Sequence, residues 1–384
     1  MTGYDVDALR EREFPWAARG ETIYLNHAST GPLPQRAVDV VAEWGRLRAN
    51  PLRLPQDLQF GTLARTRSLL ADLIGADTGE IALATNTSFG INLAAFSLPL
   101  GEGDVILTPD LEFPANIYPW MAAANRRGAA FRRVELANGV ADTETILRAL
   151  DDDRIRVLAV SWVSSANGAR LDLAALGDAC RGRGIYFVVD GIQGLGALTL
   201  DLRRLHVDIF SSGAQKWLLS PWGSGFVYVR RKLVEQLEPY DVSWLGVKGS
   251  EDFRRLPEYD LTWRDDARRF EFITLPYQDF AAMNASLELL HELGPENVAA
   301  HVERLADVIV RWTECHDEVQ LVTASERQRR GGIISVRPRD AGAASQRLTQ
   351  AKVAHSLRGD MIRLSPYLYN TVEELERALP LLSV

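Results

Sequence analysis

Short apolar runs alternate with longer segments of helical periodicity over the first two thirds of the chain. The runs that predict strands are at 81–84, 105–108, 130–134, 157–162, 186–189, 208–210 and 225–229. The segments between them repeat apolar residues every three or four positions, as Leu173, Leu176 and Cys180 do, which is typical of an amphipathic helix. Strands and helices that alternate in this way predict an α/β domain with a mainly parallel, doubly wound seven-stranded sheet.

The pattern changes after about residue 275. The elements predicted there are helices over 281–293 and 295–312, strands near 319–322 and 332–336, a helix over 343–352, a strand at 361–365 and a final helix from residue 372. This order predicts a smaller C-terminal α+β domain. We therefore divide the chain into an N-terminal segment at 1–20 that packs on the small domain, a large domain at 21–268 and a small domain at 269–384. The charge-rich stretch at 249–269 is the predicted hinge or mobile loop.

Composition and charge narrow the possible classes of protein. The 384 residues are 46% apolar, enough for a sizeable core, and the chain is long enough for two domains. It carries 43 basic and 51 acidic residues, a net charge of −8, which disfavours nucleic acid or an acidic membrane as a partner. No segment has the apolar length of a signal peptide or a membrane span, so the expected location is cytoplasmic. Cys180 and Cys315 lie far apart without Cys or His neighbours at metal-ligand spacing, which predicts neither a disulfide nor a metal site.

Two charged residues stand beyond the ends of predicted strands. Asp190 directly follows the 186–189 run, and Lys216 lies 26 residues later, after the 208–210 run. Ligand sites of open α/β sheets form beyond the carboxyl ends of the strands, so this pattern can bring a carboxylate and an amine into one crevice. Pyridoxal phosphate needs an amine to hold its aldehyde as a Schiff base, and a carboxylate to keep its ring nitrogen protonated. Taken singly, such an Asp is more often a helix cap and such a Lys a surface charge.

From about residue 24 to residue 371, the order of motifs resembles the class V aminotransferases, a family of fold-type-I pyridoxal phosphate enzymes. The family includes cysteine desulfurases, isopenicillin-N-epimerase-like proteins and kynureninases. The resemblance implies that Lys216 forms the Schiff base with pyridoxal 5'-phosphate and that Asp190 pairs with the ring nitrogen. It also implies that the large domain binds the cofactor and that the substrate is a small molecule, an α-amino acid.

A turn at 85–92 follows a predicted strand and opens a helix, where exposed amides and the helix dipole favour a phosphate. On its own this turn is a routine helix N-cap. The resemblance implies that it binds the cofactor phosphate, with the hydroxyls of Thr87 and Ser88 as donors. Ser212 and Gln215 are further predicted donors to the phosphate. Relatives usually have His where this chain has Gln215, so an acid–base role of that His is lost here.

The resemblance also implies contacts to the cofactor ring. Phe113 matches the aromatic or His residue that stacks on the pyridine ring in relatives, although most buried Phe residues are simply core. Desulfurases have His at this position, and Phe cannot move protons. Ser165 and Gln193 are predicted donors to the phenolic oxygen of the cofactor, and Asn167 is a predicted pocket residue. A plain turn rich in Ser, Asn and Gly is the alternative for 164–168.

Three further positions concern the substrate and the partner subunit. Arg363, in the segment 362–371, matches the family Arg that binds the substrate α-carboxylate through two parallel hydrogen bonds. His27 is predicted to line the substrate pocket as well. The segment 269–274 resembles an Arg-x-Glu-x-Gly-Thr element that, in relatives, reaches the phosphate of the other subunit. Thr274 therefore implies a homodimer with shared active sites, although Ile273 replaces the glycine of that element.

The reaction type is the least constrained inference. Desulfurases of the family carry a nucleophilic Cys shortly before the carboxylate-binding Arg, and no Cys occurs here between Gln350 and Arg363. Persulfide formation by that route is therefore not expected. We expect an aminotransferase in which Lys216 is the base at Cα, with a C–S lyase that needs no thiol and an amino-acid epimerase as alternatives.

Two other classes were weighed against this interpretation. A nicotinamide enzyme is disfavoured because Thr199 stands where a third glycine should follow Gly194 and Gly196. A non-catalytic protein of the same fold is disfavoured because both Asp190 and Lys216 are present.

Overall fold

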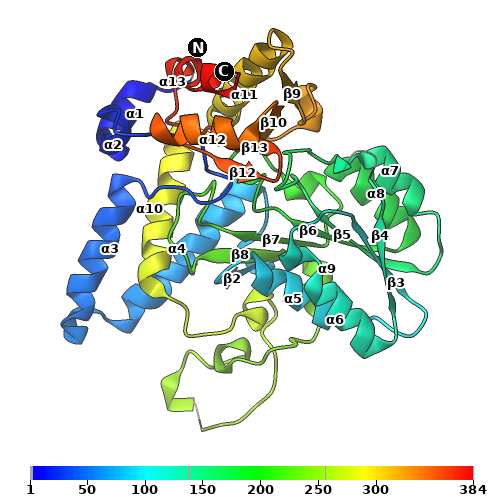
Figure 1. Cartoon of the computed structure of the whole chain (residues 1–384). Helices are drawn as coiled ribbons and strands as arrows, with labels where there is room; N and C mark the ends of the chain where they lie inside the picture. Colours follow the sequence, from blue (N-terminus) through cyan, green and yellow to red (C-terminus); the bar gives the residue numbers. More distant parts are fainter. Residues whose placement is uncertain (1–2, 137–138, 256, 384) are drawn as a thin grey trace.

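A seven-stranded sheet forms the centre of the protein in the computed structural model, which describes residues 3–136, 139–255 and 257–383 (Figure 1). In order across the sheet, the strands are β2 (Ile81–Ala84), β8 (Gly225–Val229), β7 (Ile209–Gly213), β6 (Tyr186–Asp190), β5 (Ile155–Ser161), β3 (Val105–Pro109) and β4 (Ala130–Val134). β8 runs antiparallel to both of its neighbours, and the other pairs are parallel. The prediction of a mainly parallel seven-stranded sheet is confirmed.

Helices cover both faces of this sheet, because most of its strands are apolar along their whole length and need shielding on both sides. One face carries α4 (Gln56–Ile74), α7 (Thr143–Ala149), α8 (Leu173–Arg183) and α10 (Tyr277–Leu293), and the other carries α5 (Thr87–Ser97), α6 (Tyr118–Arg127) and α9 (Arg231–Gln236). α3 (Gln35–Arg48) packs against α10 at the side of the molecule (Figure 1).

The small domain is built on a four-stranded antiparallel sheet. Its strands, in order, are β12 (Ser356–Arg358), β13 (Met361–Leu364), β10 (Ile334–Pro338) and β9 (Val319–Leu321). The helices α11 (Pro295–Glu314), α12 (Ala341–Gln350) and α13 (Val372–Ala378) enclose an apolar cluster with this sheet. Each element predicted for this region is present, and β12 is an addition that its polar sequence did not indicate.

The N-terminal part of the chain contacts the small domain. It contains α1 (Val6–Glu13) and α2 (Pro15–Ala18), and Arg10 of α1 forms an ion pair with Glu374 of α13 (3.0 Å). The Tyr4 hydroxyl donates to the Leu368 carbonyl (2.9 Å). Further along, β1 (Ile23–Tyr24) pairs in parallel with β11 (Val353–Ala354) of the small domain. Residues 1 and 2 of the predicted 1–20 segment lie outside the described residues, and the boundaries at 20/21 and 268/269 stay predictions.

The stretch at 249–269 is irregular but internally bonded. It contains short 3-10 turns at Phe253–Arg255 and Ala267–Phe270. Arg264 is buried within it and donates to the Leu245 carbonyl (2.5 Å) and to the Ser250 hydroxyl (3.2 Å). Its role as a hinge or mobile loop stays a prediction.

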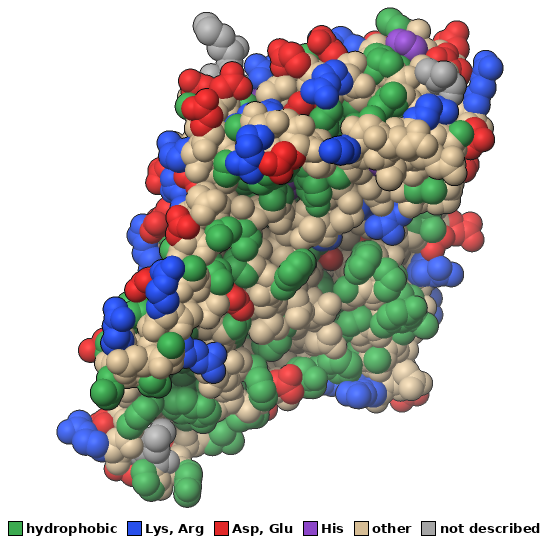
Figure 2. All heavy atoms as spheres, turned by 60° about the vertical axis from the view of Figure 1, so that its left-hand side comes forward, with side chains coloured by type: hydrophobic (Ala, Val, Ile, Leu, Met, Phe, Trp, Pro, Cys, Tyr) green, Lys and Arg blue, Asp and Glu red, His purple; other side chains and the backbone are tan. Residues whose placement is uncertain are grey.

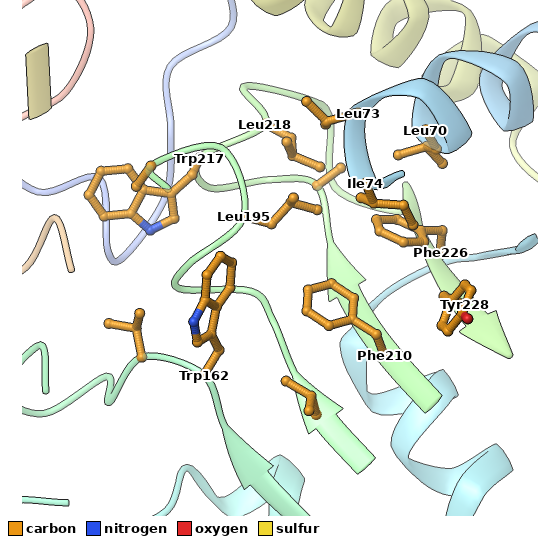
Figure 3. Close-up of a cluster of buried hydrophobic side chains, with 14 of the residues drawn as sticks. Leu70, Leu73, Ile74, Trp162, Leu195, Phe210, Trp217, Leu218, Phe226 and Tyr228 are labelled. Atoms are coloured by element: carbon orange, nitrogen blue, oxygen red, sulfur yellow. The ribbon is translucent and has the colours of Figure 1, made fainter. Parts of the chain in front are cut away.

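The largest apolar cluster lies between the sheet and α4, with its aromatic side chains toward the end of the sheet that carries the site. Figure 3 shows Phe210 and Phe226 on the sheet facing Leu70 and Ile74 of α4, with Trp162 and Trp217 beyond them. None of the described helices combines the length and the apolar character that crossing a bilayer would require.

We expect Leu70→Ala to lower the free energy of unfolding by about 2–5 kcal/mol, because Leu70 is fully buried and truncation leaves a cavity. Leu52→Ala removes the same atoms from a side chain that is 94% exposed, and should change this free energy by less than about 0.5 kcal/mol. Urea unfolding followed by circular dichroism measures both variants. Equal effects of the two substitutions would contradict the packing of α4 on the sheet.

Candidate active site

Asp190 and Lys216 follow the carboxyl ends of two neighbouring strands. β6 ends at Asp190, which pairs in register with Ser211 of β7, and the chain leaves β7 at Gly213 shortly before Lys216. Asp190 is 4% exposed and accepts a hydrogen bond from the Ile192 amide (3.0 Å). The structure thus positions these two residues at the same edge of the sheet, as the strand pattern predicts.

The charges of these residues influence each other. Burial raises the pKa of Asp190 to about 6, and the Ile192 amide and the Lys216 ammonium oppose that rise. Burial lowers the pKa of Lys216 to about 8, with Asp190 opposing the shift and Arg363 adding to it. Charges couple measurably only when they are near one another, so a carboxylate, an amine and a guanidinium share one site. An amine of lowered pKa is also the more available as a nucleophile near neutral pH.

The N-terminus of α5 is fastened to the end of β7. Asn86 caps the helix by accepting from the Phe89 amide (3.0 Å). The Thr87 hydroxyl accepts from the Gly213 amide (2.8 Å), and the Thr87 carbonyl accepts from the Ser211 hydroxyl (2.9 Å). Thr87 can still donate its own hydroxyl proton. The helix end therefore offers an anion the Thr87 hydroxyl and free backbone amides close to the strand that leads to Lys216.

The other predicted phosphate donors lie around the same helix end. Ser88 is half-buried in the first turn of α5. Ser212 is buried, and its hydroxyl donates to the Gly213 carbonyl (3.0 Å). Gln215 is half-buried, and a Cβ placed on Gly213 would lie 2.4 Å from its Oε1. These residues border the position that the sequence analysis assigns to the phosphate, and their roles there stay predictions.

Phe113 faces the lysine. Its ring is 51% exposed, and the ring centroid lies 5.9 Å from Lys216 Nζ. A flat heterocycle bound to the amine would meet this aromatic surface. Gln193, by contrast, is buried and engaged in the interior: its Nε2 donates to the Ala28 carbonyl (3.0 Å), and its Oε1 accepts from Trp217 Nε1 (3.1 Å). One N–H of Gln193 remains for the predicted bond to the phenolic oxygen.

Arg363 of β13 enters the site from the small domain. It is 2% exposed, and its Nη1 donates to the Ser165 carbonyl (2.6 Å) while Nη2 donates to the Ser29 hydroxyl (2.9 Å). Its Nε has no partner within the described residues. Burial lowers the pKa of Arg363 to about 10, so the guanidinium stays charged at neutral pH. The half-buried Ser165 is thereby fixed beside Arg363 through its main chain.

The segment that follows β1 runs directly against the lysine. The Gly31 amide donates to the Gln215 carbonyl (2.8 Å). A Cβ at Gly31 would lie 2.2 Å from the Lys216 carbonyl oxygen, so only glycine permits this approach. Since Ser29 accepts from Arg363, one short stretch of backbone touches both the amine-bearing loop and the guanidinium.

His27 lies behind this segment rather than on an open wall. It is fully buried, its Nδ1 lies 3.2 Å from the Tyr369 hydroxyl, and its ring packs on Trp217 and Tyr367. Burial lowers the pKa of His27 to about 3, so its imidazole is neutral. Its Nε2 has no partner within the described residues. The structure does not bring His27 to a surface where the predicted substrate contact could form directly.

Two other predicted residues also stand apart from the lysine. Asn167 is buried and bonded to backbone, with Nδ2 donating to the Gly139 carbonyl (2.9 Å) and Oδ1 accepting from the Ala169 amide (3.2 Å). These bonds favour a role in shaping the turn. Thr274 is exposed at the surface of the single chain, which leaves its predicted contact with a partner subunit untested.

Glu112 is a buried carboxyl in the site that sequence reasoning did not single out. It accepts from the Ser161 amide (2.6 Å) and from the Ser161 hydroxyl, and Ser161 pairs in register with Asp190. Burial raises the pKa of Glu112 to about 7, and the charge of Asp190 adds to that rise. Glu112 therefore ties the turn that carries Phe113 to the strand beside Asp190. Its place directly before Phe113 was the only sequence signal.

The residues present suit pyridoxal phosphate. The amine of Lys216 matches its aldehyde, the carboxylate of Asp190 its protonated ring nitrogen, the ring of Phe113 its flat face, and the N-terminus of α5 its phosphate. The unpaired Nε of the buried Arg363 also leaves a donor for a bound carboxylate.

Comparison with known proteins agrees with this arrangement. The family model described as aminotransferase class-V matches residues 23–378, and the chain belongs to that family, whose cofactor is pyridoxal phosphate. The chain is 33% identical to isopenicillin N epimerase of Streptomyces clavuligerus over 370 residues, which cover 92% of each protein. It is 28% identical to a cysteine desulfurase of Haloferax volcanii, over 86% of this chain and 82% of that protein.

Solved structures extend the similarity to three dimensions. A C-DES variant with glycine covalently linked to its pyridoxal phosphate has a TM-score of 0.87 at 25% identity, covering 97% of this chain and 98% of that one. The cystine C–S lyase C-DES in complex with cysteine persulfide gives 0.86 at 25% identity, covering 96% and 99%. The fold and cofactor expected from the sequence are thus confirmed.

The pKa of Lys216 predicts how covalent attachment of the cofactor depends on pH. Below about pH 8 the amine is mostly protonated and cannot attack an aldehyde, so the rate should rise about ten-fold per pH unit and level off above pH 8. Stopped-flow absorbance after mixing the apoprotein with pyridoxal phosphate measures this rate. A plateau reached only near pH 10.5 would mean that Lys216 is not buried as described.

Glu112→Ala should weaken cofactor binding about ten-fold or more, because it leaves Ser161 donors without an acceptor and releases the turn that carries Phe113. Glu112→Gln keeps one acceptor oxygen and should retain most of the affinity. Asp110→Ala, which removes a partly exposed ion pair from the same turn, is the control and should have little effect. Equilibrium dialysis gives the dissociation constants, and equal affinity in all three variants would exclude a positioning role of Glu112.

Proposed function

We propose that the protein is a pyridoxal-phosphate-dependent enzyme that acts on an α-amino acid through Lys216, with class V aminotransferase as its leading activity. The observation that carries the proposal is the coupling of Lys216 with Arg363, whose charge lowers the pKa of the amine. A substrate carboxylate paired with Arg363 would put the adjacent Cα beside Lys216. Membership of the aminotransferase class-V family supports the same proposal.

Lys216 has two roles in this proposal. Its amine holds the cofactor aldehyde until an amino acid takes its place, and the freed amine then removes the proton from Cα. When bound, the cofactor accepts the electrons left behind at Cα, and Asp190 supports this by keeping the ring nitrogen protonated. The burial of Asp190 suits the role, because a carboxylate shielded from water pairs more strongly with a cationic ring.

Where Lys216 returns the proton separates the candidate reactions. Return to the cofactor carbon gives transamination, return to the opposite face of Cα requires a second proton donor, and loss of a Cβ substituent gives elimination. Two alternatives follow from the relatives. The 33% identity with an isopenicillin N epimerase supports an amino-acid epimerase, and the similarity to the C–S lyase C-DES supports a C–S lyase. A C–S lyase of this kind needs no Cys between Gln350 and Arg363, where this chain has none.

A homodimer with shared active sites is part of the proposal. Thr274 is exposed, and Phe272 beside it is 54% exposed. The same irregular part of the large domain leaves Trp222 at 75% and Tyr259 at 95% exposure, which is unusual for large apolar side chains in a monomer. Figure 2 shows apolar side chains gathered over the lower part of the face that it presents. A second copy would bury such side chains and bring Thr274 to the partner's site.

The proposal is tested by adding a panel of L- and D-amino acids to the holoprotein. Pyridoxamine phosphate together with a keto acid would identify transamination. Ammonia with a keto acid and an unchanged cofactor would identify elimination. Exchange of the Cα proton with solvent, without either product, would identify epimerisation. Mass spectrometry and NMR distinguish the three sets of products.

Lys216→Ala provides the control, since it should abolish the visible absorbance band of lysine-bound cofactor and all three reactions. Lys248→Ala removes an equally charged side chain that pairs with Asp265 at the surface, and should keep both. An unchanged band in Lys216→Ala would refute the assignment of this lysine.

A further inference from the structure

A second arginine stands on the same face of the small-domain sheet as Arg363. β12 and β13 form an antiparallel hairpin in which Ser356 pairs with Arg363 and Arg358 pairs with Met361. Side chains of paired residues point to the same side of a sheet, and so do residues two apart on a strand. Ser356, Arg358, Met361 and Arg363 therefore share one face.

The opposite face of this hairpin belongs to the domain core. Leu357 pairs with Ile362, which is fully buried in the apolar cluster of the small domain. The register is therefore fixed by burial, because a shift by one residue would exchange the arginine face with the apolar face. Diagonal neighbours such as Arg358 and Arg363 have Cα atoms about 7–8 Å apart, so their two side chains run side by side toward the active site.

The charge of Arg358 is felt inside the site. It contributes, after burial, to lowering the pKa of Arg363, and it also lowers the pKa of Lys216. Arg358 is exposed, and no ion pair is formed by it within the residues that the structure describes. The neighbouring acid, Asp360, is paired with Arg337 instead (2.7 Å). Two guanidinium groups thus face the space above the amine, one deep and one at the rim.

We propose that Arg358 binds a second carboxylate of the substrate, so that the enzyme prefers dicarboxylic α-amino acids. This inference rests on the proposed function, in which Arg363 binds the α-carboxylate. A side-chain carboxylate of such a substrate would then extend along the hairpin toward the rim and meet Arg358. The cofactor phosphate is assigned to the N-terminus of α5, on the large domain, so it does not account for a second cation beside Arg363.

The inference is tested with pairs of substrates that differ only in charge. L-glutamate and L-glutamine have the same shape, and L-2-aminoadipate places its carboxylate one carbon further out. Dissociation constants come from titrating the visible absorbance of the holoprotein, and calorimetry supplies them without reference to turnover. The wild-type protein should bind glutamate about ten-fold more tightly than glutamine, as expected of one hydrogen bond between charged groups.

Three variants complete the experiment. Arg358→Gln should remove the glutamate preference, and Arg358→Glu should reverse it, because the rim then repels a carboxylate. Arg339→Gln, a change of the same kind at an exposed position on the small domain, should keep the wild-type ratio. Arg358 is exposed, so these changes should leave the fold intact.

The outcomes separate this inference from the function on which it rests. Equal affinity for glutamate and glutamine, or an unchanged ratio in Arg358→Gln, would overturn the role of Arg358 and leave the proposed function standing. A lower affinity of Arg358→Gln for pyridoxal phosphate with an unchanged ratio would also overturn it, by assigning Arg358 to the cofactor. A holoprotein whose spectrum responds to no amino acid would overturn both.

Discussion

Asp190 and Lys216 carry opposite charges in a place where little water reaches them. Removing either charge from water is costly, and the cost is offset only if the two groups lie close together and keep their hydrogen bonds. The opposing pKa shifts, upward for Asp190 and downward for Lys216, express this balance. The geometry of the surrounding strands must therefore be firm, because separating the pair would leave two isolated buried charges.

The sheet supplies that firmness. β6 and β7 lie side by side with apolar residues on both faces, and the hydroxyl of Thr87 joins α5 to the last amide of β7. Glu112 adds a tie from the turn that carries Phe113 to Ser161, the register partner of Asp190. Amine, carboxylate, aromatic ring and helix end are thus held by hydrogen bonds to backbone, which are shorter and less variable in direction than contacts between flexible side chains.

Much of this arrangement could be predicted from the chain alone. Strands buried on both faces appear as continuous apolar runs, so the seven strands of the large sheet were found within a few residues, and the positions of Asp190 and Lys216 followed from strand order. The role of Glu112 could not be found, because it depends on a partner 49 residues away whose side chain faces it only in the folded sheet. The burial of His27 depends in the same way on rings from Trp217, Tyr367 and Tyr369, and the pairing of Arg358 with Met361 depends on a short polar strand with little periodicity.

The segment after β1 has a mechanical consequence. It leaves the small domain where β1 pairs with β11, accepts a hydrogen bond from Arg363 at Ser29, and donates one at Gly31 to the carbonyl just before Lys216. Only two residues separate those contacts, so this strap cannot stretch much between them. A substrate that draws Arg363 away from Ser29 would therefore pull on the backbone that carries the nucleophile, and occupancy of one end would be communicated to the other without any rearrangement of the sheet.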